Sequence, residues 1–318
     1  MSSSRLFYGG LLVCAGFVTF TAWDQAHWWA LKEDYGFGWL VPLFVGYVVF
    51  ERRHLIAARC GAEVRALTDA KSSSRWFAYM GRAAAGLGLL AGTLLFLLGA
   101  WHRAAAGSSF NGTLAITLGT AVTVLAVVYL LTPTAAPTPP ERHRDRILMV
   151  GLFVFPALVW LVSAPMLAIV ENNLNVFLMR QVTTVVFSIF DQLGFSLEQR
   201  GNILVLPSGN VGVAEACSGI RSLTGCLFSG SFLAAIYLRS PIAKFVLILA
   251  SLLFAFGANL LRSVFLTTWA YRYGAAAIEG PVHDISGYAV LGLTVVGLLI
   301  CLPWLDGQGG RAKVTRAG

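Results

Sequence analysis

Three residues in the C-terminal third of the chain carry the groups that a thiol enzyme needs: Cys217, Arg262 and His283. A cysteine thiol, with a pKa of about 8.5, attacks a carbonyl carbon poorly until a base or a cation favours the thiolate. Histidine exchanges a proton near neutral pH. Arginine carries a permanent charge that can hold a thiolate or a developing oxyanion. The chemistry available to this trio is nucleophilic acyl transfer.

Four further polar residues flank the trio: Arg221, Asn259, Asp284 and Glu215. Arg221 follows the cysteine by one helical turn, where it can lower the thiol pKa or bind a substrate carboxylate. Asp284 can orient the imidazole of His283, and Glu215 can do so if its loop folds back. The five cysteines are scattered, without CxxC or Cys/His spacing. The sequence therefore predicts neither a zinc site nor a disulfide framework.

Each of these residues also has a plain structural interpretation. Cys217 can be a small buried residue, and His283 an ordinary loop histidine. Arg262 can anchor a helix at the membrane interface, and Asn259 can pair between helices. What favours chemistry is their expected depth, which depends on the elements that carry them.

The composition places those elements in a membrane. The 318 residues are 57% hydrophobic and only 12% charged, with a mean hydropathy of +0.73. A soluble domain has about 25% charged residues, so a water-soluble single-core protein and a disordered chain are both excluded. The net charge of +8 fits basic cytoplasmic loops better than a nucleic-acid partner, which we do not expect.

The fold predicted is an all-α polytopic membrane protein with about eight spans. The expected spans are Leu6–Trp23, Gly36–Phe50, Ala83–Ala100, Thr113–Leu131, Ile147–Val170, Ile220–Leu238, Phe245–Ala270 and Ser286–Trp304. With the N-terminus inside, sixteen of the 23 basic residues fall on the inner side and five on the outer side. Both termini are then cytoplasmic.

This topology places the three residues at the same depth in the membrane. Cys217 lies at the outer mouth of the sixth span, which descends to the inner side. Arg262 follows Lys244 by 18 residues on the returning span, a climb of about 27 Å. His283 precedes the last span at the outer surface. Three spans therefore bring the three side chains to the same level.

The segments between spans divide the chain. The linker TPTAAPTPP cannot be helical, so we expect a four-span half at 1–132, a Pro-rich and basic linker at 133–146, a catalytic four-span half at 147–304 and a cytoplasmic tail at 305–318. Glu171–Ala216 reads as an outer amphipathic helix followed by a short β-hairpin at Ile203–Val213. The helix and hairpin directly precede Cys217 in the sequence.

At these residues the sequence resembles the exosortase/archaeosortase family of polytopic membrane cysteine transpeptidases. The match consists of AEACSGIRSL (Ala214–Leu223), then NLLRSVFL (Asn259–Leu266) and HDISGY (His283–Tyr288). DYGFGWLVPLFVGYVVFERR (Asp34–Arg53) resembles the family's first outer loop and second span. One departure is visible there, because the family commonly has Tyr-Ser-His-Gly where this chain has Tyr35-Gly36-Phe37-Gly38.

The resemblance implies Cys217 as nucleophile, Arg262 as stabiliser of charge and His283 as acid and base, with no metal or organic cofactor. It implies exported protein substrates whose C-terminal sorting signal has a short Pro-Glu-Pro-like motif, a transmembrane helix and a basic cluster. Cleavage would proceed through a thioacyl-enzyme at the outer face of the cell inner membrane, surrounded by lipid. Water, or a lipid or glycan acceptor, would then resolve it.

Two other function classes fit the residues. A small-solute transporter would use Arg262 to bind an anion within the membrane, although we see no internal repeat of the kind that transporters favour. A non-catalytic membrane assembly factor would keep the fold without needing the cysteine.

Overall fold

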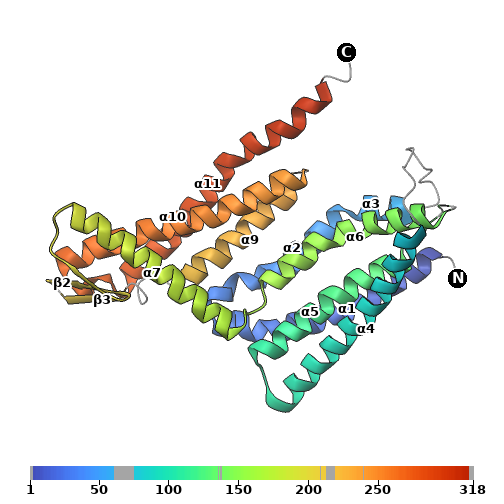
Figure 1. Ribbon diagram of the computed structural model, residues 1–318, viewed down its shortest axis with the longest axis horizontal. Coiled ribbons are helices and arrows are strands. Elements are labelled where there is room, and N and C mark those ends of the chain that lie inside the picture. The colour runs from blue at the N-terminus through green and yellow to red at the C-terminus, as the bar shows by residue number, and fades with distance from the viewer. Residues whose placement is uncertain are drawn as a thin grey trace. The chain divides into compact units, whose positions relative to one another are not determined.

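A computed structural model describes residues 3–60, 75–134, 136, 138–207, 209–212, 219–238 and 240–314. Within these ranges, seven helices are long and apolar enough to cross a bilayer. They are α1 (Ser3–Leu31), α4 (Arg75–Ala106), α5 (Phe110–Leu131), α6 (Pro139–Val162), α7 (Ala168–Gln192), α10 (Pro241–Tyr273) and α11 (Pro281–Val314) (Figure 1). The protein is therefore an all-α polytopic membrane protein, as its composition predicts.

Two of the expected spans are shorter in the structure. The second forms a 3₁₀ helix η1 (Glu33–Leu40) and the 11-residue helix α2 (Val41–Glu51), which begins where Pro42 fits the first turn. A helix of that length covers only about 16 Å. The sixth forms α9 (Gly219–Tyr237), whose apolar part begins at Ser222 and is also short. The short helix α3 (Arg53–Cys60) follows α2.

The expected amphipathic helix is present as α7. Its hydropathy of 1.2 is the lowest among the seven candidate spans, the others lying between 1.6 and 2.3. This value reflects the polar stripe seen in the sequence, which includes Arg180 and Thr184. Its apolar side packs inward through Val182, Val186 and Phe190, which are all buried.

The chain divides into two compact units, Met1–Leu167 and Ala168–Gly318. The sequence placed the boundary at 133–146, one helix earlier. The difference arises because α6 packs against α5, α4 and α2 and so belongs to the first unit. The functional assignment of the two halves stays a prediction.

In the first unit, α4 and α5 form an antiparallel pair that approaches closely through glycines (Figure 1). A Cβ added to Gly119 would lie 2.5 Å from the backbone nitrogen of Phe96 and 2.6 Å from the carbonyl oxygen of Gly92. Small residues at such a crossing let two membrane helices gain backbone contact. The close packing of α4 against α5 therefore requires a residue without a side chain at position 119.

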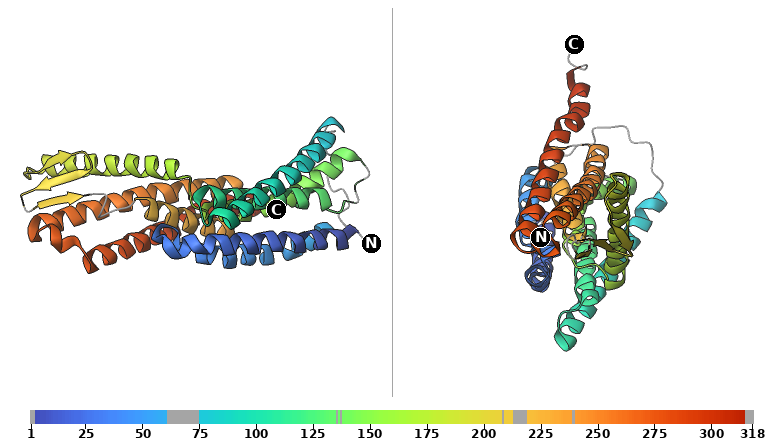
Figure 2. Two further views of the ribbon diagram at one scale, coloured as in Figure 1. Left: turned by 90° about the horizontal axis from the view of Figure 1, so that it is seen from below. Right: turned by 90° about the vertical axis from the view of Figure 1, so that its left-hand side faces the viewer.

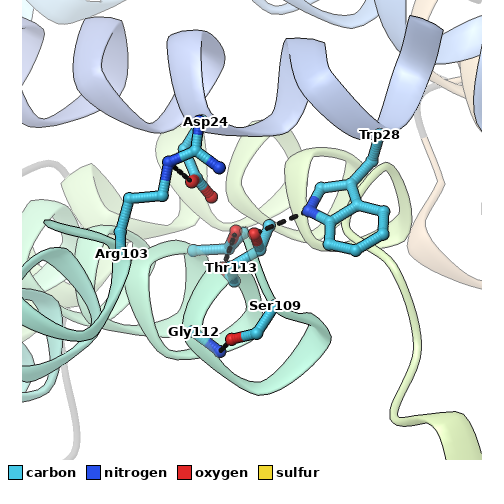
Figure 3. Close-up of polar contacts among 7 residues, drawn as sticks. Asp24, Trp28, Arg103, Ser109, Gly112 and Thr113 are labelled. Atoms are coloured by element: carbon cyan, nitrogen blue, oxygen red, sulfur yellow. Dashed lines mark hydrogen bonds and ion pairs between the residues drawn. The ribbon is translucent and has the colours of Figure 1, made fainter. Parts of the chain in front are cut away.

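A polar seam joins α1 to α5 in the same unit. Thr21 and Thr120 share a hydrogen bond of 2.7 Å between their hydroxyls. One turn on, the Gln25 side chain donates to the hydroxyl of Thr117 at 2.8 Å. The seam continues at the indole of Trp28, which donates to Thr113 at 2.8 Å (Figure 3). We define this set as the α1–α5 seam; its threonines recur at helical spacing along α5.

A buried ion pair lies beside the seam. Asp24 on α1 is fully buried, and its Oδ1 lies 3.3 Å from Nε of Arg103 on α4 (Figure 3). The start of α5 is capped by Ser109, whose Oγ accepts from the backbone N–H of Gly112 at 3.1 Å. The pair and the cap together hold the same ends of α1, α4 and α5.

The second unit combines three packed helices with a small sheet. Helices α9, α10 and α11 share an apolar core that contains Leu233, Leu247 and Leu298. The strands β1 (Glu198–Arg200), β2 (Ile203–Leu206) and β3 (Gly209–Gly212) form an antiparallel sheet in the order β1-β2-β3. The predicted hairpin is β2–β3. The sheet lies beside α7 and α10, as two views agree (Figures 1 and 2).

Candidate active site

Arg262 lies two thirds of the way along α10, a helix that is longer than a bilayer is thick. The 33 residues of α10 extend for about 50 Å, whereas a hydrocarbon core is about 30 Å thick. Arg262 follows the first residue, Pro241, by about 32 Å of helix. Its side chain is half-buried. The guanidinium therefore lies where a membrane-spanning α10 would leave the hydrocarbon.

The first two turns of α11 supply the groups that hold this guanidinium. Nε of Arg262 donates to the Oγ of Ser286 at 3.0 Å. Nη2 of Arg262 donates to the backbone carbonyl oxygen of His283, also at 3.0 Å. The hydroxyl of Ser286 in turn donates to that same carbonyl at 2.7 Å. Arg262 and His283 are thus brought together from two helices, through the backbone of the histidine.

The neighbouring residues differ in their exposure. His283 is half-buried and Asp284 is exposed. Asn259, one turn before Arg262, is only 4% exposed, and its Oδ1 has no hydrogen-bond partner among the described residues. Unpaired buried acceptors are rare in proteins. Asn259 is therefore an open acceptor close in sequence and on the helix to an anchored donor.

The remaining candidates lie in the sequence between the end of β3 and the first turn of α9. Cys217 and Glu215 lie outside the described residues. Arg221 is in the first turn of α9, and its side chain is also outside the description. The structure thus gives the two ends of this segment: β3 ends at Gly212, and α9 begins at Gly219.

The sheet fixes the first of those ends. Leu206 on β2 and Val211 on β3 are buried against Leu266 and Ala270 of α10. On the other side of β2, Leu204 joins Val186 of α7. Gly209, the first residue of β3, has a φ of 132°, which is unfavourable for residues with a side chain. The segment that precedes Cys217 is therefore held against the part of α10 just beyond Arg262.

A comparison with protein families identifies the chain from this architecture. A family model for transmembrane exosortases matches residues 28–300, which is most of the chain. The chain belongs to the transmembrane exosortase family. Searches of curated proteins and of solved structures found no match. The match covers both structural units and all seven of the proposed site residues.

The loop in which this exosortase departs from the family's commonest residues has a packing role here. Tyr35 is fully buried, and its hydroxyl accepts a hydrogen bond of 3.0 Å from the backbone N–H of Met166. A Cβ at Gly38 would overlap the indole of Trp29. Tyr35 and Gly38 therefore fix η1 against the rest of the first unit.

The exosortase also has an open groove between α7 and β1, with a volume of about 730 Å³. Gln199 joins its walls by donating to the hydroxyl of Thr184 at 3.3 Å. On β1, Arg200 donates two hydrogen bonds to Glu198 and lowers the pKa of that carboxyl. Arg180, also on the wall, has no ion-pair partner among the described residues. The groove therefore carries one uncompensated positive charge.

Ser286 is the residue of this site that sequence reasoning missed. Ser286 belongs to the motif HDISGY and is the first residue of the last expected span, but the sequence assigned it no role in the site. Its spacing of three from His283 was available as a signal, because a serine hydroxyl in a helix bonds to a carbonyl three or four residues earlier. What the spacing could not reveal is the arginine from another helix.

Proposed function

We propose that this exosortase is a membrane-embedded cysteine endopeptidase and transpeptidase. It cleaves C-terminal sorting signals from exported proteins through a thioacyl-enzyme. The nucleophile is Cys217, the proton carrier is His283, and Arg262 stabilises negative charge. The observation that carries the proposal is the pair of hydrogen bonds that tie Arg262 to Ser286 and to the His283 carbonyl.

The first step forms the thioacyl-enzyme. The proton of the Cys217 thiol passes to the imidazole of His283, and the thiolate attacks the carbonyl carbon of the scissile peptide bond. The carbonyl oxygen becomes an oxyanion, which the guanidinium of Arg262 stabilises. When the C–N bond breaks, His283 returns the proton to the leaving amine, and the C-terminal tail departs.

The second step regenerates the thiol. Water, or a hydroxyl or amine of an acceptor, attacks the thioester carbon and gives its proton to His283. The C–S bond breaks, the Cys217 thiolate leaves, and it recovers the proton. The product is a shortened protein with a free carboxyl, or one joined to the acceptor lipid or glycan. Asn259 supports both steps by accepting a hydrogen bond from a donor in the site.

The charge distribution of the sequence supports the proposed setting. Both termini are cytoplasmic, and the site faces the outer side of the cell inner membrane. The substrate's own transmembrane helix stops its tail in the bilayer, so its short motif lies at the depth that Arg262 has on α10. A basic cluster after that helix keeps the tail from being pulled through.

The test is co-expression with a reporter protein that carries a tripartite C-terminal tail from the same genome. The size of the reporter is followed on a gel for the wild type and for Cys217→Ala. We expect tail removal by the wild type and none by the variant, with both proteins in the membrane. Tail removal by Cys217→Ala would refute the assignment.

The matched control is Cys226→Ala. Cys226 lies on α9, within the same unit, and is fully buried. This variant removes a thiol without touching Arg262 or His283, so tail removal should continue. Loss of processing in both variants would instead indicate that removal of either thiol disturbs the fold, and the Cys217→Ala result would then not identify a nucleophile.

A further inference from the structure

The hydrogen bonds of Arg262 use one particular edge of its guanidinium. A guanidinium has a side edge, formed by Nε and one Nη group, and an end edge, formed by the two Nη groups. Here the side edge is occupied, because Nε donates to Ser286 and Nη2 donates to the His283 carbonyl. Within the described residues, Nη1 has no hydrogen-bond acceptor. The end edge is therefore the one left for a ligand.

Ser286 determines which edge of the guanidinium is occupied. A hydroxyl carries one donor and two acceptor lone pairs. Ser286 gives its proton to the His283 carbonyl at 2.7 Å, which leaves its lone pairs for Nε of Arg262 at 3.0 Å. Ser286 is 8% exposed, so water does not readily replace it. Alanine at this position would remove the bond to Nε and the bond to the carbonyl together.

Helix α11 also passes close to the guanidinium at Gly287. A Cβ placed on Gly287 would lie 3.4 Å from Nη2 and 3.5 Å from Cζ of Arg262, which is ordinary van der Waals contact. The two hydrogen bonds to Ser286 and to the His283 carbonyl hold the side edge and so fix the rotation of the guanidinium.

We propose that Ser286 is a positioning residue, which orients Arg262 so that its end edge faces the reacting carbonyl oxygen. This inference rests on the proposed function. Two parallel N–H groups on the end edge form a fork for an oxyanion. A guanidinium that rotates freely offers the same donors only part of the time, and misplacement of about 1 Å can cost about 100-fold in rate.

The first experiment measures single-turnover cleavage of a reporter tail by the full-length protein in detergent. Ser286→Ala should lower the rate of tail release by about 100-fold with little change in the substrate concentration for half-maximal rate. Ser286→Thr keeps a hydroxyl and should recover part of the rate. A rate within about 3-fold of the wild type for Ser286→Ala would overturn the proposal.

The matched control is Ser251→Ala. Ser251 on α10 is fully buried, and its hydroxyl donates to the carbonyl of Ile248, three residues earlier, at the same 2.7 Å. It therefore makes the same helical bond as Ser286 without an arginine. Ser251→Ala should keep the wild-type rate. An equal loss in both variants would mean that a helical hydroxyl, not the orientation of Arg262, was being measured, and would reject the proposal.

The second experiment does not depend on cleavage. In protein labelled with ¹⁵N-arginine, the Nε–H signal of Arg262 is assigned by its loss in Arg262→Lys, and its exchange with water is measured. Exchange should become at least about 10-fold faster in Ser286→Ala and stay unchanged in Ser251→Ala. Unchanged exchange in Ser286→Ala refutes the anchoring. Faster exchange, with no cleavage of the tail by the wild type, refutes the proposed function and hence the catalytic purpose of the anchor.

Discussion

Arg262 and Ser286 lie 24 residues apart on different helices and are joined by a hydrogen bond of 3.0 Å from Nε to Oγ. The bond crosses the contact between α10 and α11 at the point where α11 begins. Because the same serine donates to the His283 carbonyl, the charged group of α10 and the first two turns of α11 are joined by hydrogen bonds. The predictions below begin from this arrangement.

Replacing Arg262 by lysine should reduce tail removal by about 10²–10³-fold, the usual cost of losing an oxyanion donor. An ammonium keeps the charge but has no planar fork, so it cannot bond to Ser286 and a substrate oxygen in the same geometry. The measurement is the rate of reporter processing at equal amounts of membrane protein. Arg272→Lys is the control, because Arg272 lies exposed in the last turn of the same helix. Near-normal processing by Arg262→Lys would contradict a role in stabilising charge and would indicate that Arg262 only anchors α10 at the membrane interface.

A thiol reagent that cannot cross membranes should label Cys217 in intact cells from the outer side, and Cys217→Ala should abolish labelling. Of the four other cysteines, Cys14, Cys60 and Cys226 are buried and Cys301 is partly exposed, so Cys301 is the one that can contribute background. Burial also raises the pKa of the Cys60 thiol, which lowers its thiolate fraction at neutral pH. Labelling of Cys217 only in inverted vesicles would contradict the proposed orientation.

Asp24→Ala should destabilise the first unit by about 3–5 kcal/mol, because it leaves the Arg103 charge without its partner. The pair is close to fully enclosed, with Asp24 unexposed and Arg103 16% exposed. The measurement is the midpoint of thermal unfolding in detergent. Replacing both residues, Asp24→Asn with Arg103→Gln, should recover part of the loss. If the double variant is less stable than Asp24→Ala, the pair is not the interaction that matters.

Gly119→Ala should destabilise the protein by about 1–3 kcal/mol through overpacking. The new Cβ would meet the backbone of α4, which cannot move aside as a flexible side chain can. Gly86→Ala on α4 is the control, since a Cβ there meets nothing within 4 Å. The two variants are compared by their unfolding midpoints, and equal values would contradict the close crossing of α4 and α5.

The helices of the second unit could be predicted because long apolar runs in a membrane protein have few alternatives. The expected spans Phe245–Ala270 and Ser286–Trp304 fall within α10 and α11, and the expected hairpin is β2–β3. Strand β1 was not predicted, since Glu198-Gln199-Arg200 has no apolar alternation. It is a strand because β2 offers it a hydrogen-bonding edge, which is a tertiary effect.

The site could be predicted only as far as depth along helices allows. Counting residues brought Arg262 and His283 to one level, and the two are joined through the His283 carbonyl. Residue counting could not identify Ser286, because its role depends on how α11 is rotated about its axis toward Arg262. The α1–α5 seam was missed for a similar reason: Thr113, Thr117 and Thr120 lower the hydropathy of a span only slightly, so nothing marks the helix they face.

The ion pair between Asp24 and Arg103 also limits when α1 can reach its final packing during synthesis. Arg103 is made 79 residues after Asp24. At about 5–20 residues per second, a nascent chain waits on the order of 4–16 s before α4 can supply the counter-charge. During that interval the Asp24 carboxylate lacks the partner that it has in the folded protein. Burial of Asp24 can therefore be completed only after α4 has been made, so the final packing of α1 follows the synthesis of α4.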